Sequence, residues 1–287
     1  MTAAFSPGPP WRTVRVRGAR PADLPTVAAL CRRTVGVGDY VLFDLAATLR
    51  AGGVLLAVDH GRAVGMMDTA PTADGALWLS KARTDPAWQR KGVARAVIGA
   101  AVERARRRGL GALRLWTNAD NASGNIASRK AGMWEVARFF GAMARPLREV
   151  PRSTEAASRS QVGATVLSSP VLADGKGYVP ADWHFVRWSR RLLRHPSMEI
   201  VREHRGAVLA SRALARRSFP YGWFAFAVLR GPVTAALREG RRIAGAMEAD
   251  RAFVYLPARP AYRRASRAAG FETLDWGTEA VVYERRL

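Results

Sequence analysis

The stretch that decides the fold is residues 85–101, DPAWQRKGVARAVIGAA, in which Gln-Arg-Lys at 89–91 stands directly before Gly92. Small and branched apolar residues follow. Val93, Val97 and Ala101 repeat at four-residue spacing, which is typical of one buried face of a helix. The pattern predicts a helix over residues 91–108 that begins immediately after a glycine loop.

The loop is expected to join the end of a strand to the start of that helix. At a helix start several backbone N–H groups have no partner, and the helix dipole adds partial positive charge, so the place favours an anion such as a phosphate. Gly92 would let the main chain approach that anion closely, because any side chain would stand between them. An ordinary helix start with solvated cations is the alternative reading.

The flanking segments predict the order β-α-β-β-β-α-β-α-β. Residues 13–17 alternate as a strand, and residues 18–35 open with Pro and Asp before a helical apolar stripe. Residues 36–52 are left as a looser segment. The remaining predictions are two strands over 54–69 with a tight turn at 59–61, strands at 76–84 and 112–117, a helix over 121–132 and a strand from Met133. This is a mixed α/β sheet.

The pattern partly recurs in the second part of the chain. ASRKAGM at 127–133 is answered by ASRAAGF at 265–271, and each follows a short strand and an earlier helix, residues 91–108 or 232–249. We therefore predict two tandem domains of one architecture, at 1–145 and 183–287, joined by a Pro-, Ser- and Gly-rich linker at 146–182. The second copy has VLRGPVTAALREG in place of the glycine loop, so it is predicted to be degenerate and to have lost the ligand.

Composition limits the remaining classes. The 287 residues carry a formal charge of +23, but the basic residues are scattered, which favours a biased surface over a nucleic-acid footprint. Cys31 is the only cysteine, so disulfides within the chain and multi-cysteine zinc sites are excluded, and we expect no metal. No apolar run reaches membrane-spanning length, and the start lacks a signal-peptide core. A cytoplasmic protein is expected.

The sequence resembles the GNAT N-acetyltransferase superfamily. The family signature Gln/Arg-x-x-Gly-x-Gly/Ala appears as the run Gln89, Arg90, Lys91, Gly92, Val93 and Ala94. A family asparagine about eleven residues before Gly-Phe appears as Asn121, with Gly132 and Met133. The resemblance covers residues 13–145 and implies that the loop amides hold the pyrophosphate of acetyl-CoA, that Asn121 helps to position it, and that the strand residues Ala82, Arg83 and Thr84 pair with its pantetheine arm.

Two positions depart from the family pattern. Ser80 stands where related enzymes often carry a glutamate base, and Ser128 stands where many members carry a tyrosine acid. Neither serine is a competent base at neutral pH. Asp68 on the neighbouring strand is therefore the candidate base, acting through a water. The alternative is that Asp68 is an ordinary solvated strand residue. Deprotonating a lysine side chain at pH 7 costs about 4.6 kcal/mol, against about 1 kcal/mol for a peptide α-amine. The missing base therefore favours a weakly basic acceptor.

Three functions from different classes remain open. The leading one is an N-acetyltransferase, active in its first copy, that transfers acetyl from acetyl-CoA to an amine of a small molecule, amino acid or peptide. A homodimer is an open alternative for its oligomeric state. A non-catalytic acyl-CoA-binding regulatory protein is the alternative, motivated by Ser80 and Ser128. The third is a nucleic-acid-associated protein, motivated by the charge and by the aromatic and basic residues of 181–195. Catalysed thiol release with an amine panel separates the first from the second.

Overall fold

The first half of the chain, residues 14–151, follows the predicted order with one helix added. The computed structural model describes residues 14–151, 159–181, 183–195, 200–204, 206–211, 222–274 and 279–287. The elements of the first half are β1 (Arg15–Gly18), α1 (Leu24–Thr34), α2 (Val41–Arg50), β2 (Leu55–Asp59), β3 (Arg62–Pro71), β4 (Ala76–Thr84), α3 (Val93–Arg107), β5 (Ala112–Asn118), α4 (Ala122–Lys130) and β6 (Trp134–Ala144), with short 3-10 turns at Pro21–Asp23 and Pro86–Trp88.

Helix α2 lies in the segment that the sequence left without an element. Val41, Leu45 and Leu49 are buried along one face, at the same four-residue spacing that marks α3. The helix has only ten residues and no side-chain hydrogen bond at its N-cap, Tyr40. A short helix without a capping signal is stabilised chiefly by packing, which explains why local pattern alone did not predict it.

Helices cover both faces of the first half of the sheet. Met66 of β3 lies in a core with Val27, Leu30 and Leu45 of α1 and α2, whereas Met67 lies in a core with Val97 of α3. Successive strand residues point to opposite faces, so Asp68 shares the face of Met66 and α2. At Gly65 an added Cβ would lie 2.5 Å from Val93 Cγ1, so this glycine lets the start of α3 press against β3.

The second half, residues 159–287, repeats a strand-helix-strand order after several short elements. Its elements are α5 (Arg159–Val166), α6 (Pro170–Asp174), β7 (Tyr178–Ala181), β8 (His184–Arg187), β9 (Ile200–His204), β10 (Ala207–Ser211), β11 (Trp223–Arg230), α7 (Val233–Ala246), β12 (Arg251–Pro257), α8 (Pro260–Ala268), β13 (Glu272–Thr273) and β14 (Ala280–Arg286), with a 3-10 turn at Arg190–Arg194. Within the predicted linker, 152–158 and 182 lie outside the described residues, and α5, α6 and β7 occupy much of the rest.

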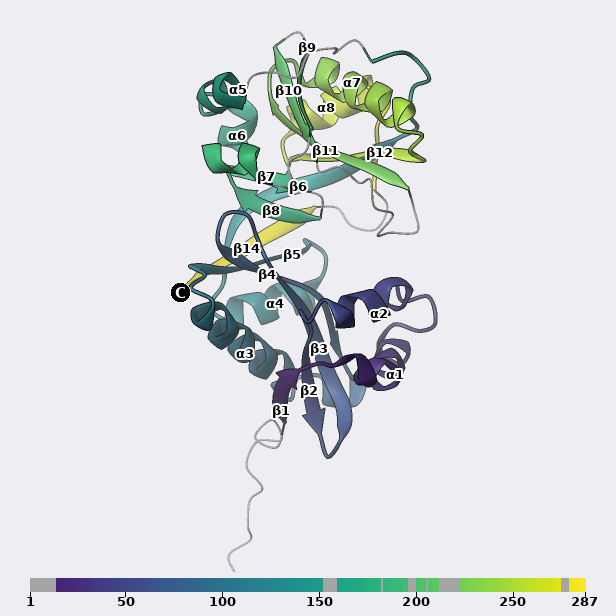
Figure 1. Ribbon diagram of the computed structural model, residues 1–287, viewed down its shortest axis with the longest axis vertical. Helices are drawn as coiled ribbons and strands as arrows, with labels where there is room; N and C mark the ends of the chain where they lie inside the picture. Colours follow the sequence, from purple (N-terminus) through teal and green to yellow (C-terminus); the bar gives the residue numbers. More distant parts are fainter. Residues whose placement is uncertain are drawn as a thin grey trace, which may run out of the picture.

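One continuous mixed sheet joins the two halves, with strand order β1-β2-β3-β4-β5-β14-β6-β12-β11-β10-β9. The mixed α/β fold class is thus confirmed. Strand β14 of the second half pairs antiparallel with β5, and β6 of the first half pairs antiparallel with β12. Figure 1 shows β14 crossing between the two lobes, with β5 beside it and β6 reaching into the upper lobe. Each half therefore completes the sheet of the other, and the predicted boundaries at 145 and 183 do not divide the sheet.

A buried polar network fixes this exchange. Arg114 of β5 is 2% exposed, and its guanidinium donates to Glu284 Oε2 on β14 at 2.7 Å and to Asp74 Oδ2 at 2.8 Å. The hydroxyl of Tyr178 donates to the same Glu284 oxygen at 2.8 Å, and burial is the first cause that raises the pKa of Tyr178 to about 12. Removing one partner would leave a buried charge unpaired, so the network specifies which strand lies beside β5.

Within the described part of the chain, no helix is both long enough and apolar enough to cross a bilayer.

Candidate functional site

The neighbouring strands β4 and β5 run together only at their beginnings. They pair in parallel from Ala76–Ala112 to Trp78–Arg114, although β4 continues to Thr84 and β5 to Asn118. Beyond Trp78, the described residues of β4 pair only with β3. Its other edge therefore presents backbone N–H and C=O groups toward the opening between the two strands, where an extended ligand could pair with them.

A bulge marks the middle of this free edge. Between the pairs Met66–Arg83 and Asp68–Ser80, β4 has two residues opposite one of β3. Lys81, the first of those two, has a left-handed φ of 53°, which is uncommon for a residue with a side chain. Because a bulge redirects the backbone, Ala82, Arg83 and Thr84 leave the line that β4 follows up to Ser80.

The predicted glycine loop lies where β4 ends. Gly92 has a φ of 84° and precedes the first residue of α3, Val93, while Arg90 has a φ of 62°. The first amides of α3, including those of Val93 and Ala94, belong to the turn in which a helix provides no acceptor. Lys91 Nζ lies 5.5 Å from the ring centroid of Trp88. The loop thus presents main-chain donors together with cationic side chains.

A carboxylate that the sequence analysis did not single out holds this loop in place. Asp85 is 2% exposed; its Oδ1 accepts from the amide of Ala87 at 3.1 Å, and its Oδ2 accepts from Arg62 at 2.8 Å and from Arg33 at 3.0 Å. Burial alone would raise its pKa, but the hydrogen bonds from Arg62, Ala87 and Arg33 outweigh it and hold the pKa of Asp85 below its usual value. The sequence signal that could have identified Asp85 is its place at the start of the DPA turn, two residues before Ala87.

Arg83 contributes its backbone to the free edge and its side chain to an ion pair. Its guanidinium donates to both carboxylate oxygens of Asp39, with Nε 2.7 Å from Oδ2. Asp39 is 1% exposed, and despite burial the hydrogen bond from Arg83 keeps its pKa lowered. The side chain of Arg83 is thus engaged with the turn between α1 and α2, and the predicted pairing of its strand with the cofactor stays a prediction.

The side chain of Asn121 caps α4. Its Oδ1 accepts from the amide of Gly124 at 3.0 Å, and its Nδ2 donates to Thr117 Oγ1 at 2.9 Å, so its predicted contact with the cofactor stays a prediction. Ser128 is 3% exposed, and its Oγ donates to Gly124 O at 2.8 Å within the same helix. A hydroxyl held in this way is poorly placed to donate to a leaving group, so the structure offers no support for Ser128 as a catalytic acid.

A tyrosine of the exchanged strand lies against the same helix. Tyr283 of β14 is 1% exposed, and its hydroxyl donates to Asn125 Oδ1 of α4 at 2.9 Å. The sequence analysis missed this contact, because 158 residues separate the two positions and only the strand exchange brings them together.

The two other candidate catalytic residues lie directly opposite each other. Asp68 of β3 and Ser80 of β4 are register partners next to the bulge, on the face that α2 covers. Burial is the main reason that the pKa of Asp68 is raised, and nearby Lys81 opposes it. Lys81 Nζ donates to Asp44 Oδ2 at 2.7 Å and to Thr48 Oγ1 at 2.8 Å, both on α2. Asp68 is therefore a partly desolvated carboxylate without a salt bridge among the described residues.

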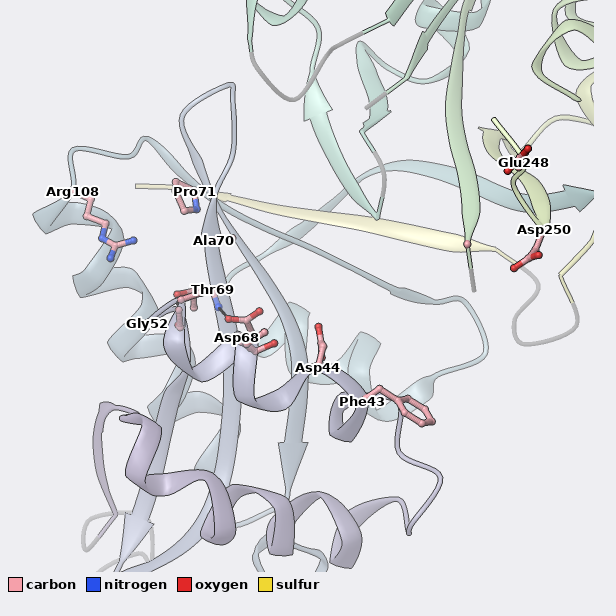
Figure 2. Close-up of a pocket in the computed structure, with 15 residues that line it drawn as sticks. Phe43, Asp44, Gly52, Asp68, Thr69, Ala70, Pro71, Arg108, Glu248 and Asp250 are labelled. Atoms are coloured by element: carbon pink, nitrogen blue, oxygen red, sulfur yellow. Dashed lines mark hydrogen bonds between the residues drawn. The ribbon is translucent and has the colours of Figure 1, made fainter. Parts of the chain in front are cut away.

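A cavity of about 1090 Å³ opens beside Asp68. It is lined by α2 and residues 52–53, by residues 68–71 of β3, by Arg108, and by Gly222, Glu248 and Asp250 of the second half. Figure 2 shows Asp44 and Asp68 on one side of this space and Glu248 and Asp250 on the other. We call it the interlobe cavity. Both halves of the chain contribute to it.

Comparison with known proteins agrees with this geometry. The profile of the acetyltransferase (GNAT) family matches residues 30–127, a range that begins within α1, ends within α4 and includes the glycine loop. A search of curated protein sequences gives no significant match. Residues 30–127 are therefore similar to acetyltransferases of the GNAT family, whose members use acetyl-CoA as acyl donor.

Solved structures share the fold of the whole chain. A GCN5-related N-acetyltransferase from Sphaerobacter thermophilus has a TM-score of 0.59 at 15% identity, with 96% of each chain covered. A protein from Thermoplasma acidophilum classed as an acetyltransferase has a TM-score of 0.62 at 12% identity, with 95% of this chain and 100% of that chain covered. A GCN5-related N-acetyltransferase from Kribbella flavida gives 0.50 at 14%, with 96% and 71% covered. At these identities the likeness establishes the fold alone.

Proposed function

We propose that this protein is an N-acetyltransferase that transfers acetyl from acetyl-CoA directly to an amine, and that the first half holds the donor. The observation that carries the proposal is the opening between β4 and β5, which has a free strand edge on one side and the glycine-led start of α3 at its end. A long donor with an amide-containing arm and a pyrophosphate matches both features, because the arm can pair with the edge and the anion with the helix amides.

The residues present fit such a donor. The backbone of Ala82–Thr84 would pair with the arm, and the amides of Gly92, Val93 and Ala94 would hold the pyrophosphate, with Gln89, Arg90 and Lys91 adding donors and charge. Bound acetyl-CoA supplies an acetyl thioester. Gly92 adopts a conformation that residues with side chains rarely adopt, so the loop is built around its glycine.

Direct transfer requires a neutral amine, and Asp68 is the residue proposed to make it neutral. A general base works best when its pKa approaches the working pH, and burial moves the pKa of Asp68 in that direction. The carboxylate would accept the amine proton directly or through one water. Backbone N–H groups near Thr84 would stabilise the negative charge that develops on the acetyl oxygen. Ser80, opposite Asp68, would line the path of the amine.

We further propose that the second half is a degenerate copy of the first. Strands β11 and β12 are parallel, are connected through α7, and pair only from Trp223–Arg251 to Phe226–Val254 although β11 continues to Arg230. This parallels β4, α3 and β5. Here, however, the space beyond the paired region is filled: Val171 of α6 packs in one core with Val228 and Leu256, and Leu172 packs in another with Leu229.

The loop before α7 is also closed to an anion. A Cβ added at Gly231 would lie 2.5 Å from Gly206 O and from Ala207 Cα, so the turn between β9 and β10 occupies the space in front of the helix. Pro232 precedes Val233 and has no N–H to donate. These contacts support a single donor site, in the first half.

Thiol release from acetyl-CoA in the presence of a panel of amines and amino acids tests the proposal. We expect amine-dependent release, with the acetylated amine identified by mass spectrometry. Tight binding of acetyl-CoA without release for any amine would favour the non-catalytic, regulatory alternative. Absence of binding would contradict both functions.

A further inference from the structure

We propose that the interlobe cavity is the acceptor site and that it selects an acceptor carrying a fixed positive charge in addition to the reacting amine. The inference rests on the proposed acetyl transfer and names its substrate class. Its first support is position. The cavity reaches Asp68, which lies opposite Ser80 and next to the bulge in the middle of the free edge of β4.

The second support is the charge of the lining. The chain carries 46 Lys and Arg residues against 23 Asp and Glu residues, so a surface taken at random is basic. Among the described residues, the charged side chains that line the cavity are Asp44, Asp68, Glu248, Asp250 and Arg108. Acidic residues from two separate halves thus converge on one space in a strongly basic protein. Walls of one sign concentrate ligands of the opposite sign.

The third support is the pairing of these carboxylates. Among the Asp and Glu side chains that the structure describes, those without a salt bridge are Asp68, Asp120, Glu248, Asp250 and Glu272. Three of these five line the cavity. Asp44 is paired with Lys81 through Oδ2, yet its Oδ1 is buried and has no hydrogen-bond partner in the described structure. The exposed carboxylates of Glu248 and Asp250 are available to a cationic ligand.

The two sides of the cavity suit the two groups of such an acceptor. Figure 2 places Asp68 on β3, on the side of the transfer site, and Glu248 and Asp250 on the second half across the cavity. A reacting amine near Asp68 would leave a second cation facing Glu248 and Asp250. The α-amine of a residue with a cationic side chain has both properties, because an α-amine is weakly basic while its side chain stays charged.

Two amides of equal size test this selection, since arginine amide and citrulline amide differ chiefly in the charge at the end of the side chain. We expect kcat/KM of the wild type to be about fivefold higher for arginine amide than for citrulline amide. In the double variant Glu248→Gln/Asp250→Asn this ratio should fall close to one, because KM for arginine amide rises. Glu248 and Asp250 are exposed, so their amide variants should fold. Glu272→Gln removes an exposed, unpaired carboxylate outside the cavity and should keep the wild-type ratio.

The outcomes separate the two proposals. Acetylation of both amides with a ratio near one in the wild type would overturn the cationic selection and leave acetyl transfer intact. An unchanged ratio in the double variant would overturn the assigned site. If acetyl-CoA binds but neither amide is acetylated, the binding of arginine amide is measured by calorimetry. If the wild type binds arginine amide and the double variant does not, the cation site is retained although acetyl transfer is not. If the wild type does not bind arginine amide, the cation site is overturned as well.

Discussion

At the scale of single residues, the proposed donor site depends on the left-handed conformation of one glycine. Gly92 and Gly109 lie at opposite ends of α3 with φ values of 84° and 64°. Both positions would be strained by a side chain, at a cost of about 1–2 kcal/mol each. They differ in what they face, because Gly92 precedes the free amides of the first turn and Gly109 follows the last turn. This difference makes Gly109 a matched control for backbone strain.

We predict that Gly92→Glu abolishes acetyl-CoA binding, because the carboxylate adds bulk and negative charge where the pyrophosphate is expected. Gly109→Glu should lose similar stability and still bind. Isothermal titration calorimetry on both variants, after thermal melts confirm folding, makes the comparison. Wild-type affinity in a folded Gly92→Glu protein would refute the donor site.

We predict that the ionised carboxylate of Asp68 lowers the stability of the folded protein and supports its catalytic activity. Its folded-state pKa is raised, so the folded state binds the proton more tightly than the unfolded state does, and the ionised carboxylate opposes folding as pH rises above the unfolded value. Asp68→Asn should therefore raise Tm at neutral pH and lower kcat/KM by about 100-fold, the lower range for a lost general base. Thermal melts and initial rates measure the two effects; unchanged kcat/KM would remove Asp68 from the reaction.

The pH profile gives a second readout of this role. With Asp68 as base, the rising limb of kcat/KM in the wild type should include an enzyme group whose position stays fixed when the acceptor changes. In Asp68→Asn the limb should follow the pKa of each acceptor. Two acceptors that differ in pKa, measured with both proteins, are sufficient for the test.

At the scale of elements, the turn between β4 and α3 is held by charge rather than by apolar packing alone. Asp85 follows β4 directly and joins the 3-10 turn Pro86–Trp88, α1 and β3 through its bonds to Ala87, Arg33 and Arg62. Its lowered pKa means that its contribution to stability is present above the unfolded carboxyl pKa and is lost as pH falls through the folded value. The element that presents the glycine loop should therefore loosen in acid.

We predict that Asp85→Asn lowers the free energy of unfolding at pH 7 by about 2 kcal/mol, because two guanidinium groups lose a nearly buried carboxylate. The loss should shrink toward pH 3. Glu103→Gln is the control, since the side chains of Glu103 and its partner Arg106 are 58% and 57% exposed, and such surface pairs contribute about 0–1 kcal/mol. Urea unfolding at several pH values measures both variants; equal losses would contradict the assigned role of Asp85.

At the scale of the whole molecule, we propose that the second half is a degenerate copy of the first and that only the first half binds the donor. A hydrogen bond to α8 holds helix α6 in place: the hydroxyl of Tyr262 on α8 donates to Asp174 Oδ2 of α6 at 2.8 Å. Because α6 and the turn at Gly206 occupy the second groove, we predict one acetyl-CoA per chain. Calorimetric titration should give a stoichiometry near one in the wild type and none in Gly92→Glu. Two sites, or one that survives in the variant, would contradict this.

The parts of the fold that depend on residues close together in the sequence could be predicted from the sequence. Residue spacing predicted α3, α4, the hairpin of β2 and β3, and the mixed sheet, because each depends on neighbours within a few turns. The order of strands at the centre of the sheet could not be predicted, because Arg114 and Glu284 are 170 residues apart and no local pattern records their contact. For the same reason the acidic residues of the second half that line the interlobe cavity were not singled out.

The exchange of β6 and β14 also has a consequence for biosynthesis. During translation, β5 leaves the ribosome long before β14, so the half that carries the glycine loop has an unpaired strand edge until the residues around 280–286 have been made. Strand β6 must likewise wait for β12. Pairings of such long sequence separation form slowly and expose edges to aggregation. Nascent chains stalled before residue 280 should therefore depend on chaperones, whatever the stability of the finished protein.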